Sequence, residues 1–175
     1  MILAALGAGA AGCSLYYLML TIQVSGQGGP SPSTPGAATP SLAVAPGKAI
    51  NISATPYAGY SFVNWTTISG PAIIANPNGA STTVTLTVGD AAIQANFSVL
   101  QYTLTVNFVG TGTTTPFGPV SVDYGAQTSI TATTTGTFVN WTVASGTATI
   151  AAPTSATTTV TLTSGSATIQ ANFTP

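Results

Sequence analysis

The chain has 175 residues, of which 45% are hydrophobic and 2% are charged, and it contains no histidine. Its charged side chains are Lys48, Asp90 and Asp123, and they cannot supply the histidine or carboxylate pair that general acid–base catalysis needs within one subunit. They are also too few to bind a metal ion or the phosphates of a nucleic acid. We therefore expect that the chain is not an enzyme, that it has no catalytic, metal-binding or cofactor-binding residues, and that it binds no nucleic acid.

The first predicted element covers residues 1–24, "MILAALGAGAAGCSLYYLMLTIQV". As an α-helix this segment would be about 36 Å long, enough to cross the hydrocarbon core of a bilayer. Gly7 and Ala11 are four residues apart, a spacing that lets helices pack closely. We predict a hydrophobic N-terminal helix that serves as an assembly or membrane segment, and the residues expected to mediate assembly are Met1, Leu3, Leu6, Gly7, Ala11, Leu15, Tyr16, Leu18, Met19 and Leu20.

Other interpretations of this segment are open. A cleaved secretory signal would need basic residues before the apolar run, and residues 1–6 contain none. Acylation of Cys13, as in a lipoprotein, would leave the long apolar stretch after Cys13 unexplained. A permanent membrane anchor is the main alternative to an assembly helix.

Residues 25–41, "SGQGGPSPSTPGAATPS", are rich in Gly, Pro and Ser. Such a composition is typical of a flexible linker, and it is also compatible with a long hairpin loop inside the first repeat. We favour the loop.

The rest of the chain is an internal repeat. The segment "FVNWTTISGPAIIANPNGASTTVTLTVGDAAIQANFS" from Phe62 matches "FVNWTVASGTATIAAPTSATTTVTLTSGSATIQANFT" from Phe138, and the first copy carries two extra residues around "PYAGY". The second copy opens with "YTLTVNFVG" at Tyr102. Its counterpart would be "LTIQV" from Leu20, which would make the end of the apolar segment the first strand of repeat one. We divide the chain into residues 1–24, a first repeat at 25–100 and a second at 101–175.

Each copy alternates apolar and polar residues, as in "TTVTLTV" at Thr82 and "IQANFS" at Ile93. This period of two predicts half-buried strands, and the Gly and Pro clusters between the runs predict turns. We expect a mainly β fold: the N-terminal helix followed by two tandem small antiparallel β-sandwiches of about five or six strands each.

Aromatic residues recur at matching places in both copies. Phe62 and Trp65 are three residues apart, which a regular strand cannot place on one face, so either a β-bulge intervenes or that strand is covered on both sides. We interpret these aromatics as core residues that each repeat needs to fold, in preference to a platform for sugars. The predicted core anchors are Phe62, Trp65, Phe97, Phe138, Trp141 and Phe173.

Five N-x-[ST] sequons are candidate sites of N-glycosylation. Four belong to the repeat motif itself, whereas Asn51 corresponds to Ser129 in the second copy. The strand period places some of these side chains outward, and sugar there would help to hydrate a surface with almost no charge. The candidate sites are Asn51, Asn64, Asn96, Asn140 and Asn172.

The recurring pattern "Y-T-L-T-V … I-T-A-T … F-V-N-W-T … T-V-T-L-T … I-Q-A-N-F" resembles the divergent internalin B-repeat group of bacterial and archaeal surface proteins, over residues 42–98 and 101–175. The resemblance implies an extracellular stalk, adhesion or scaffold role and brings no catalytic residues. The segment "LYYLMLTIQVSG" is similar to the end of archaeal type IV pilin helices. Bacterial pilins have glutamate at the fifth mature position, where this chain has Ala5.

From these observations we expect a structural subunit of an extracellular, type IV pilus-like filament at the cell surface, which polymerises through its N-terminal helix and carries the β repeats outside. Its expected partners are copies of itself, the membrane during assembly, and surface glycans or host surfaces. The alternative is a membrane-anchored or lipidated cell-surface adhesin or stalk protein.

Overall fold

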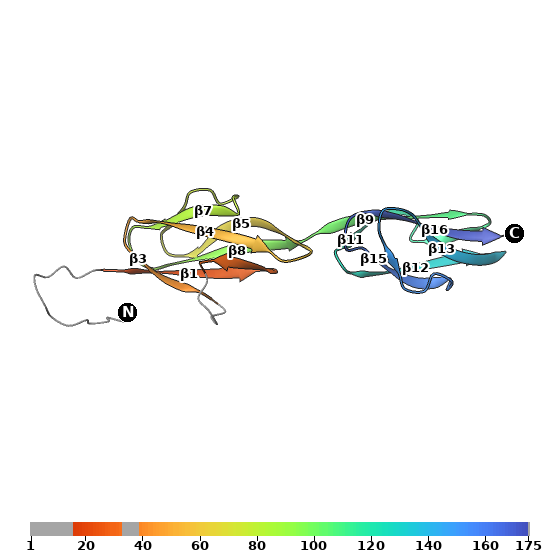
Figure 1. Cartoon of the computed structure of the whole chain (residues 1–175), viewed down its shortest axis with the longest axis horizontal. Helices are drawn as coiled ribbons and strands as arrows, with labels where there is room; N and C mark the ends of the chain where they lie inside the picture. The colour runs from red at the N-terminus through yellow and green to blue at the C-terminus, as the bar shows by residue number, and fades with distance from the viewer. Residues whose placement is uncertain (1–15, 33–38, 175) are drawn as a thin grey trace, which may run out of the picture.

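The computed structural model describes residues 16–32 and 39–174, and within them every regular element is a β-strand. The two repeats follow one another along the long axis of the molecule and contain eight strands each (Figure 1). Repeat one contains β1 (Leu18–Ser25), β2 (Gly28–Ser31), β3 (Ser41–Val44), β4 (Ala49–Pro56), β5 (Tyr60–Ser69), β6 (Ala72–Ile74), β7 (Ser81–Leu86) and β8 (Ala91–Val99). Repeat two contains β9 (Gln101–Val109), β10 (Gly112–Thr115), β11 (Gly118–Asp123), β12 (Gln127–Thr134), β13 (Thr137–Ser145), β14 (Thr149–Ile150), β15 (Thr157–Thr161) and β16 (Ala167–Thr174).

Each repeat is a sandwich of two four-stranded sheets, and the strand order is the same in both copies. In repeat one the orders are β3-β1-β8-β5 and β2-β4-β7-β6; in repeat two they are β11-β9-β16-β13 and β10-β12-β15-β14. All pairs are antiparallel except β1 with β8 and β9 with β16, which are parallel. The expectation of purely antiparallel sandwiches is therefore wrong for one sheet in each repeat.

The prediction of an N-terminal helix is wrong. Strand β1 begins at Leu18 and pairs with β3 on one side and β8 on the other. Leu18, Leu20 and Ile22 point into the core and are almost completely buried, while the residues between them face outward, which is the period of a strand. Residues 1–15 lie outside the described part of the chain. No helix within residues 16–32 and 39–174 is long and apolar enough to span a membrane.

Part of the Gly- and Pro-rich segment at 25–41 belongs to the sandwich. Its residues Gly28–Ser31 form β2, which pairs with β4. The segment is thus a connection inside repeat one where the structure describes it, with a short edge strand of its own.

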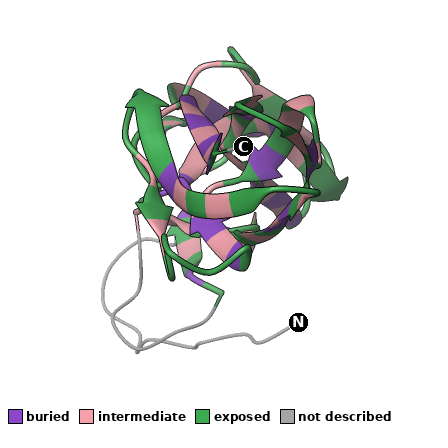
Figure 2. Ribbon diagram, turned by 90° about the vertical axis from the view of Figure 1, so that its right-hand side faces the viewer, coloured by how far each residue is buried: buried purple, intermediate pink, exposed green. Residues whose placement is uncertain are grey.

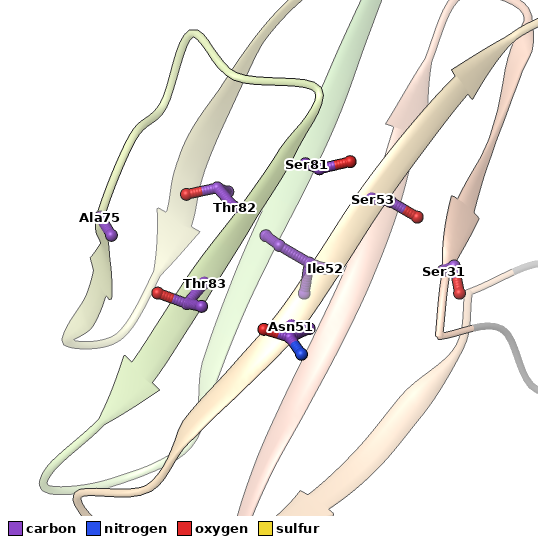
Figure 3. A pocket seen from close by; sticks show the side chains of 8 residues that line it. All are labelled: Ser31, Asn51, Ile52, Ser53, Ala75, Ser81, Thr82 and Thr83. Carbon is purple, nitrogen blue, oxygen red and sulfur yellow. The ribbon is translucent and has the colours of Figure 1, made fainter.

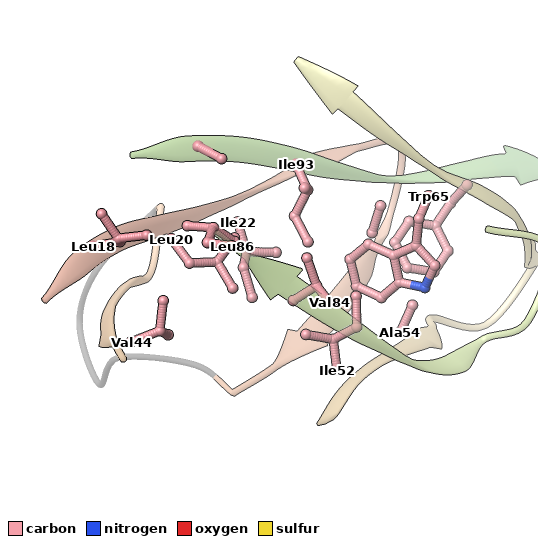
Figure 4. Close-up of a cluster of buried hydrophobic side chains, with 13 residues drawn as sticks. Leu18, Leu20, Ile22, Val44, Ile52, Ala54, Trp65, Val84, Leu86 and Ile93 are labelled. Carbon is pink, nitrogen blue, oxygen red and sulfur yellow. The ribbon is translucent and has the colours of Figure 1, made fainter. Parts of the chain in front are cut away.

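The core of each repeat lies between its two sheets, and buried segments alternate with more exposed ones along the strands when the molecule is viewed end-on (Figure 2). In repeat one, Trp65 packs near Ile52, Ala54 and Val84, and smaller aliphatic side chains fill the space toward β1 (Figure 4). Burying a large apolar side chain contributes roughly 1.5–3 kcal/mol, so a sandwich of this size depends strongly on its few bulky residues.

Candidate functional site

The aromatic residues that the sequence predicts as core anchors have the same arrangement in both repeats. Trp65 and Trp141 are each 2% exposed, and Phe97 and Phe173 are each 7% exposed. Phe62 and Phe138 are partly buried and pack against the same clusters. Their rings contact one another at matching distances, with centroids 5.8 Å apart for Phe62–Trp65 and 5.7 Å apart for Phe138–Trp141.

A β-bulge places both aromatics of β5 on one face. Phe62 lies opposite Phe97, and Asn64 lies opposite Asn96, so Val63 is an extra residue in β5. The same shift separates Phe138 from Asn140 in β13. Of the two explanations for the three-residue spacing, the structure contains the bulge.

The sequon asparagines of the repeat motif form pairs across the strands. Asn96 donates a hydrogen bond from Nδ2 to Oδ1 of Asn64 at 2.8 Å, and Asn172 donates the equivalent bond to Asn140 at 2.8 Å. The Nδ2 atom of Asn96 or Asn172 is the atom that a sugar would modify, and it is already engaged in a partly buried contact. These four residues therefore act as structural cross-strand pairs in both repeats.

Asn51 is placed differently. Its side chain is exposed on the outer face of β4 and lines a shallow groove of about 540 Å³ (Figure 3). The other lining residues are mostly small and carry hydroxyl groups: Ser31, Ile52, Ser53, Ala75, Ser81, Thr82 and Thr83. The groove can offer hydrogen bonds but holds no charged or nucleophilic pair.

The acidic residues have structural contacts that sequence reasoning missed. Asp90 Oδ1 accepts a hydrogen bond from the backbone N–H of Met19 at 2.8 Å, and Asp123 Oδ1 accepts one from the side chain of Gln101 at 2.9 Å. Within the described part of the chain, no three potential ligands gather in a way that could hold a metal ion. The turn-like sequence around Asp90 gave no signal of its distant partner.

The residues predicted to mediate assembly do not form one surface in the described structure. Leu18 and Leu20 belong to the core, and Tyr16 and Met19 are 66% and 40% exposed. The remaining members lie outside the described residues: Met1, Leu3, Leu6, Gly7, Ala11 and Leu15.

The junction between the repeats is a single residue held from both sides. Leu100 connects β8 to β9, its N–H donates to the carbonyl oxygen of Gly59 in repeat one at 2.8 Å, and its own carbonyl oxygen accepts from the N–H of Tyr124 in repeat two at 2.8 Å. The backbone at the joint is thus tied to a turn of each sandwich.

A side-chain contact reinforces this joint. The ring of Tyr124 lies so close to Gly59 that a Cβ atom added to Gly59 would stand 2.2 Å from the ring, and Gly59 has a φ of +82°. The ring of Tyr102 packs against that of Tyr124, with the two centroids 6.4 Å apart. The loop that contains Gly59 is where the first copy has its two extra residues.

Comparison with protein families gives one match. The family model of the divergent InlB B-repeat domain matches residues 30–101 and residues 102–175. The comparisons with curated proteins and with solved structures found no match.

Proposed function

Because this chain belongs to the divergent InlB B-repeat domain family, we propose that it is an extracellular stalk segment of a cell-surface protein. In this function its two β modules hold the ends of the chain apart, and they catalyse no reaction. The single observation that carries the proposal is the parallel pairing of the first and last strands of each repeat. Parallel neighbours place the point where the chain enters a module and the point where it leaves at opposite ends, so successive modules extend a rod.

The joint supports the same proposal. Strands β8 and β9 and the intervening Leu100 form one extended run from Ala91 to Val109, which spans about 60 Å at about 3.3 Å per residue. The hydrogen bonds of Leu100 and the packing of Tyr124 on Gly59 restrict bending at its middle. A stalk needs this stiffness to keep its ends apart.

The surface composition also fits an exposed position. Threonine, serine and asparagine side chains dominate the outward positions of the strands, as in β12 and β15. Their hydroxyl and amide groups form hydrogen bonds with water, so the surface is hydrated although it carries almost no charge. We keep surface glycans and host surfaces as proposed partners, with the groove at Asn51 as the place on repeat one where a sugar has hydroxyl groups to contact.

The pilus-like filament is the finer function that the sequence predicts, and its polymerisation depended on a helix over residues 1–24. Residues 18–24 are instead committed to β1 and to the core of repeat one. We therefore propose the stalk and do not propose helix-driven polymerisation.

Two measurements test this function. Antibodies against the β modules should label intact native cells; labelling that requires permeabilised cells would refute the surface location. For the rod, dyes attached in a Cys13→Ser background at Lys48→Cys and Thr135→Cys, which lie in turns at opposite ends of the two-repeat unit, should report a separation of about 60 Å by single-molecule energy transfer. A separation below half that value would mean that the repeats fold back on one another.

A further inference from the structure

The middle of one sheet in each repeat consists of the first and last strands of that repeat. In repeat one, β1 pairs with β8 in six registered positions, from Leu20 opposite Ala91 to Ser25 opposite Asn96. In repeat two, β9 pairs with β16 in six positions, from Leu104 opposite Ala167 to Val109 opposite Asn172. The two ladders are equivalent and occupy the same place in the strand order.

This arrangement determines the direction in which a force on the chain ends loads the hydrogen bonds between the two strands. A pull on the ends draws the start of β1 and the end of β8 in opposite directions along the strands, so the two strands must slide past each other. The hydrogen bonds between the two strands then carry the load at the same time and must break together before the strands can separate. In an antiparallel terminal pair both pulled ends would lie at one edge, and the bonds would open one after another.

The ladder is also protected from water on one side and at both flanks. Leu20 and Ile93 are fully buried beneath it, and β3 and β5 cover its outer flanks by pairing with β1 and β8. A hydrogen bond shielded in this way loses less to competing water than an exposed one.

A polar contact closes the ladder where it begins. The N–H of Met19 donates to Asp90 Oδ1 at 2.8 Å in repeat one, and the N–H of Thr103 donates to Ser166 Oγ at 2.9 Å in repeat two. In both repeats the donor lies one residue before the first registered pair of the ladder, and the acceptor lies one residue before the partner strand begins. Asp90 and Ser166 thus make the same contact at equivalent positions, although they are different residue types.

We propose that each repeat is a tension-bearing clamp, in which the parallel ladder and the polar contact at its start resist the separation of the chain ends. This inference rests on the proposed stalk function, because a surface stalk transmits force between the cell and whatever its far end holds. Force would pass from β1 to β8, through Leu100 into β9, and across the second ladder to β16.

The test compares two pulling directions across the same pair of strands. In a Cys13→Ser background, handles at Met19→Cys and Ser98→Cys load the β1–β8 ladder in shear, and handles at Ser25→Cys and Ser98→Cys peel it open from one end. Forced unfolding is governed by the unfolding rate in each direction, so we expect a severalfold higher rupture force for the shear pair. Equal forces in the two directions would overturn the proposal.

A second experiment keeps the native direction and pulls the whole chain by its ends. Unfolding repeat one releases roughly 80 residues, or about 280 Å of extended chain, and unfolding repeat two releases roughly 75 residues, or about 260 Å; each gain is reduced by the folded length of about 30 Å. Asp90→Ala should lower the force of the longer step only, and Ser166→Ala that of the shorter step only. Forces that stay unchanged in both variants would contradict the role of the contact at the start of the ladder.

Failure of the clamp proposal and failure of the stalk proposal give different experimental results. Labelling of permeabilised cells alone would refute the surface location and leave the force measurements as they are. Equal rupture forces would refute the clamp and leave a surface-exposed spacer.

Discussion

Replacement of Trp141 by alanine is the most informative perturbation of the fold. The indole is 2% exposed, packs on Phe138, and donates a hydrogen bond from Nε1 to the carbonyl oxygen of Ser155 at 3.1 Å. Removing a buried tryptophan side chain costs about 3–5 kcal/mol, and the lost hydrogen bond adds about 1 kcal/mol. A module of roughly 75 residues has a total stability of about 4–11 kcal/mol, so Trp141→Ala should remove a large part of it or all of it.

The chain provides its own reporters for this experiment. It has two tryptophans, one in each repeat, so Trp65 fluorescence in the Trp141→Ala variant follows repeat one alone, while circular dichroism follows both repeats. With an m-value of about 1–1.5 kcal/mol/M for a small module, a loss of about 4–6 kcal/mol lowers the urea concentration at which repeat two unfolds by about 3–6 M. The Trp65 signal should keep nearly its original midpoint.

The matched control is Trp65→Ala, which has the same environment in repeat one, including the hydrogen bond from Nε1 to the carbonyl oxygen of Gly79 at 3.2 Å. It should destabilise repeat one and leave the Trp141 signal in place. If either substitution shifted both transitions together by the same amount, the two repeats would be one cooperative unit, and our treatment of the cores as independent would be refuted.

Three further predictions use differences between neighbouring sites. Thr114 is buried and its Oγ1 has no hydrogen-bond partner among the described residues, so Thr114→Val should raise the free energy of unfolding by about 1 kcal/mol in urea titrations; a loss of stability would point to a missed partner. Gly110→Ala should lower the melting temperature more than Gly125→Ala. Both glycines have positive φ, but a Cβ at Gly110 would stand 2.2 Å from the backbone oxygen of Phe173, whereas one at Gly125 meets nothing within 4 Å. Equal losses of melting temperature would show that backbone strain at positive φ, and not the clash, sets the cost. Among the five sequons we expect the highest glycan occupancy at Asn51, measured by peptide mass spectrometry of native protein, and higher occupancy at Asn96 would contradict our view of the paired asparagines.

The sequence predicted the aromatic anchors' environment through spacing alone. Phe62 and Trp65 could both be buried only if an extra residue brought them to one face or if the strand was covered on both faces, and the structure has the extra residue at Val63. Such a prediction succeeds because it depends on the local geometry of one strand. It needs no knowledge of which strand lies beside it.

The apolar segment at the N-terminal end shows where that kind of reasoning fails. Leu18, Leu20 and Ile22 alternate inward as a strand, but the outward Met19 is also apolar, so the period of two is hidden inside a run that equally suits a buried helix. The partners that decide between the two are Ala91–Val99 and Ser41–Val44, which are distant in sequence. The alignment of "LTIQV" with the opening of the second copy contained the correct answer, and Leu20 and Leu104 indeed occupy the same position in the two parallel ladders.

The alternation of apolar and polar residues does not predict which strands pair, so it could not predict the parallel ladder on which the proposed clamp depends. The pattern of β8 identifies Ile93 and Ala95 as inward residues, but the same pattern would result from a parallel or an antiparallel neighbour. The contact between Asp90 and the N–H of Met19 follows from that choice of neighbour. It had no separate signal in the sequence.

Two of the differences between the copies lie at the joint. Tyr124, whose ring packs on Gly59, corresponds to Pro46 in the first copy, and the loop that carries Gly59 is two residues longer than its counterpart in the second copy. Both differences lie on the contact between the repeats, one on each side of it. The aromatic triads that the two cores share have nearly equal ring spacings, and repeat two adds Phe108, whose ring centroid lies 6.4 Å from that of Phe173. We infer that the cores are held alike by the requirement to fold, whereas the facing turns differ because together they fix the angle at which one module continues into the next.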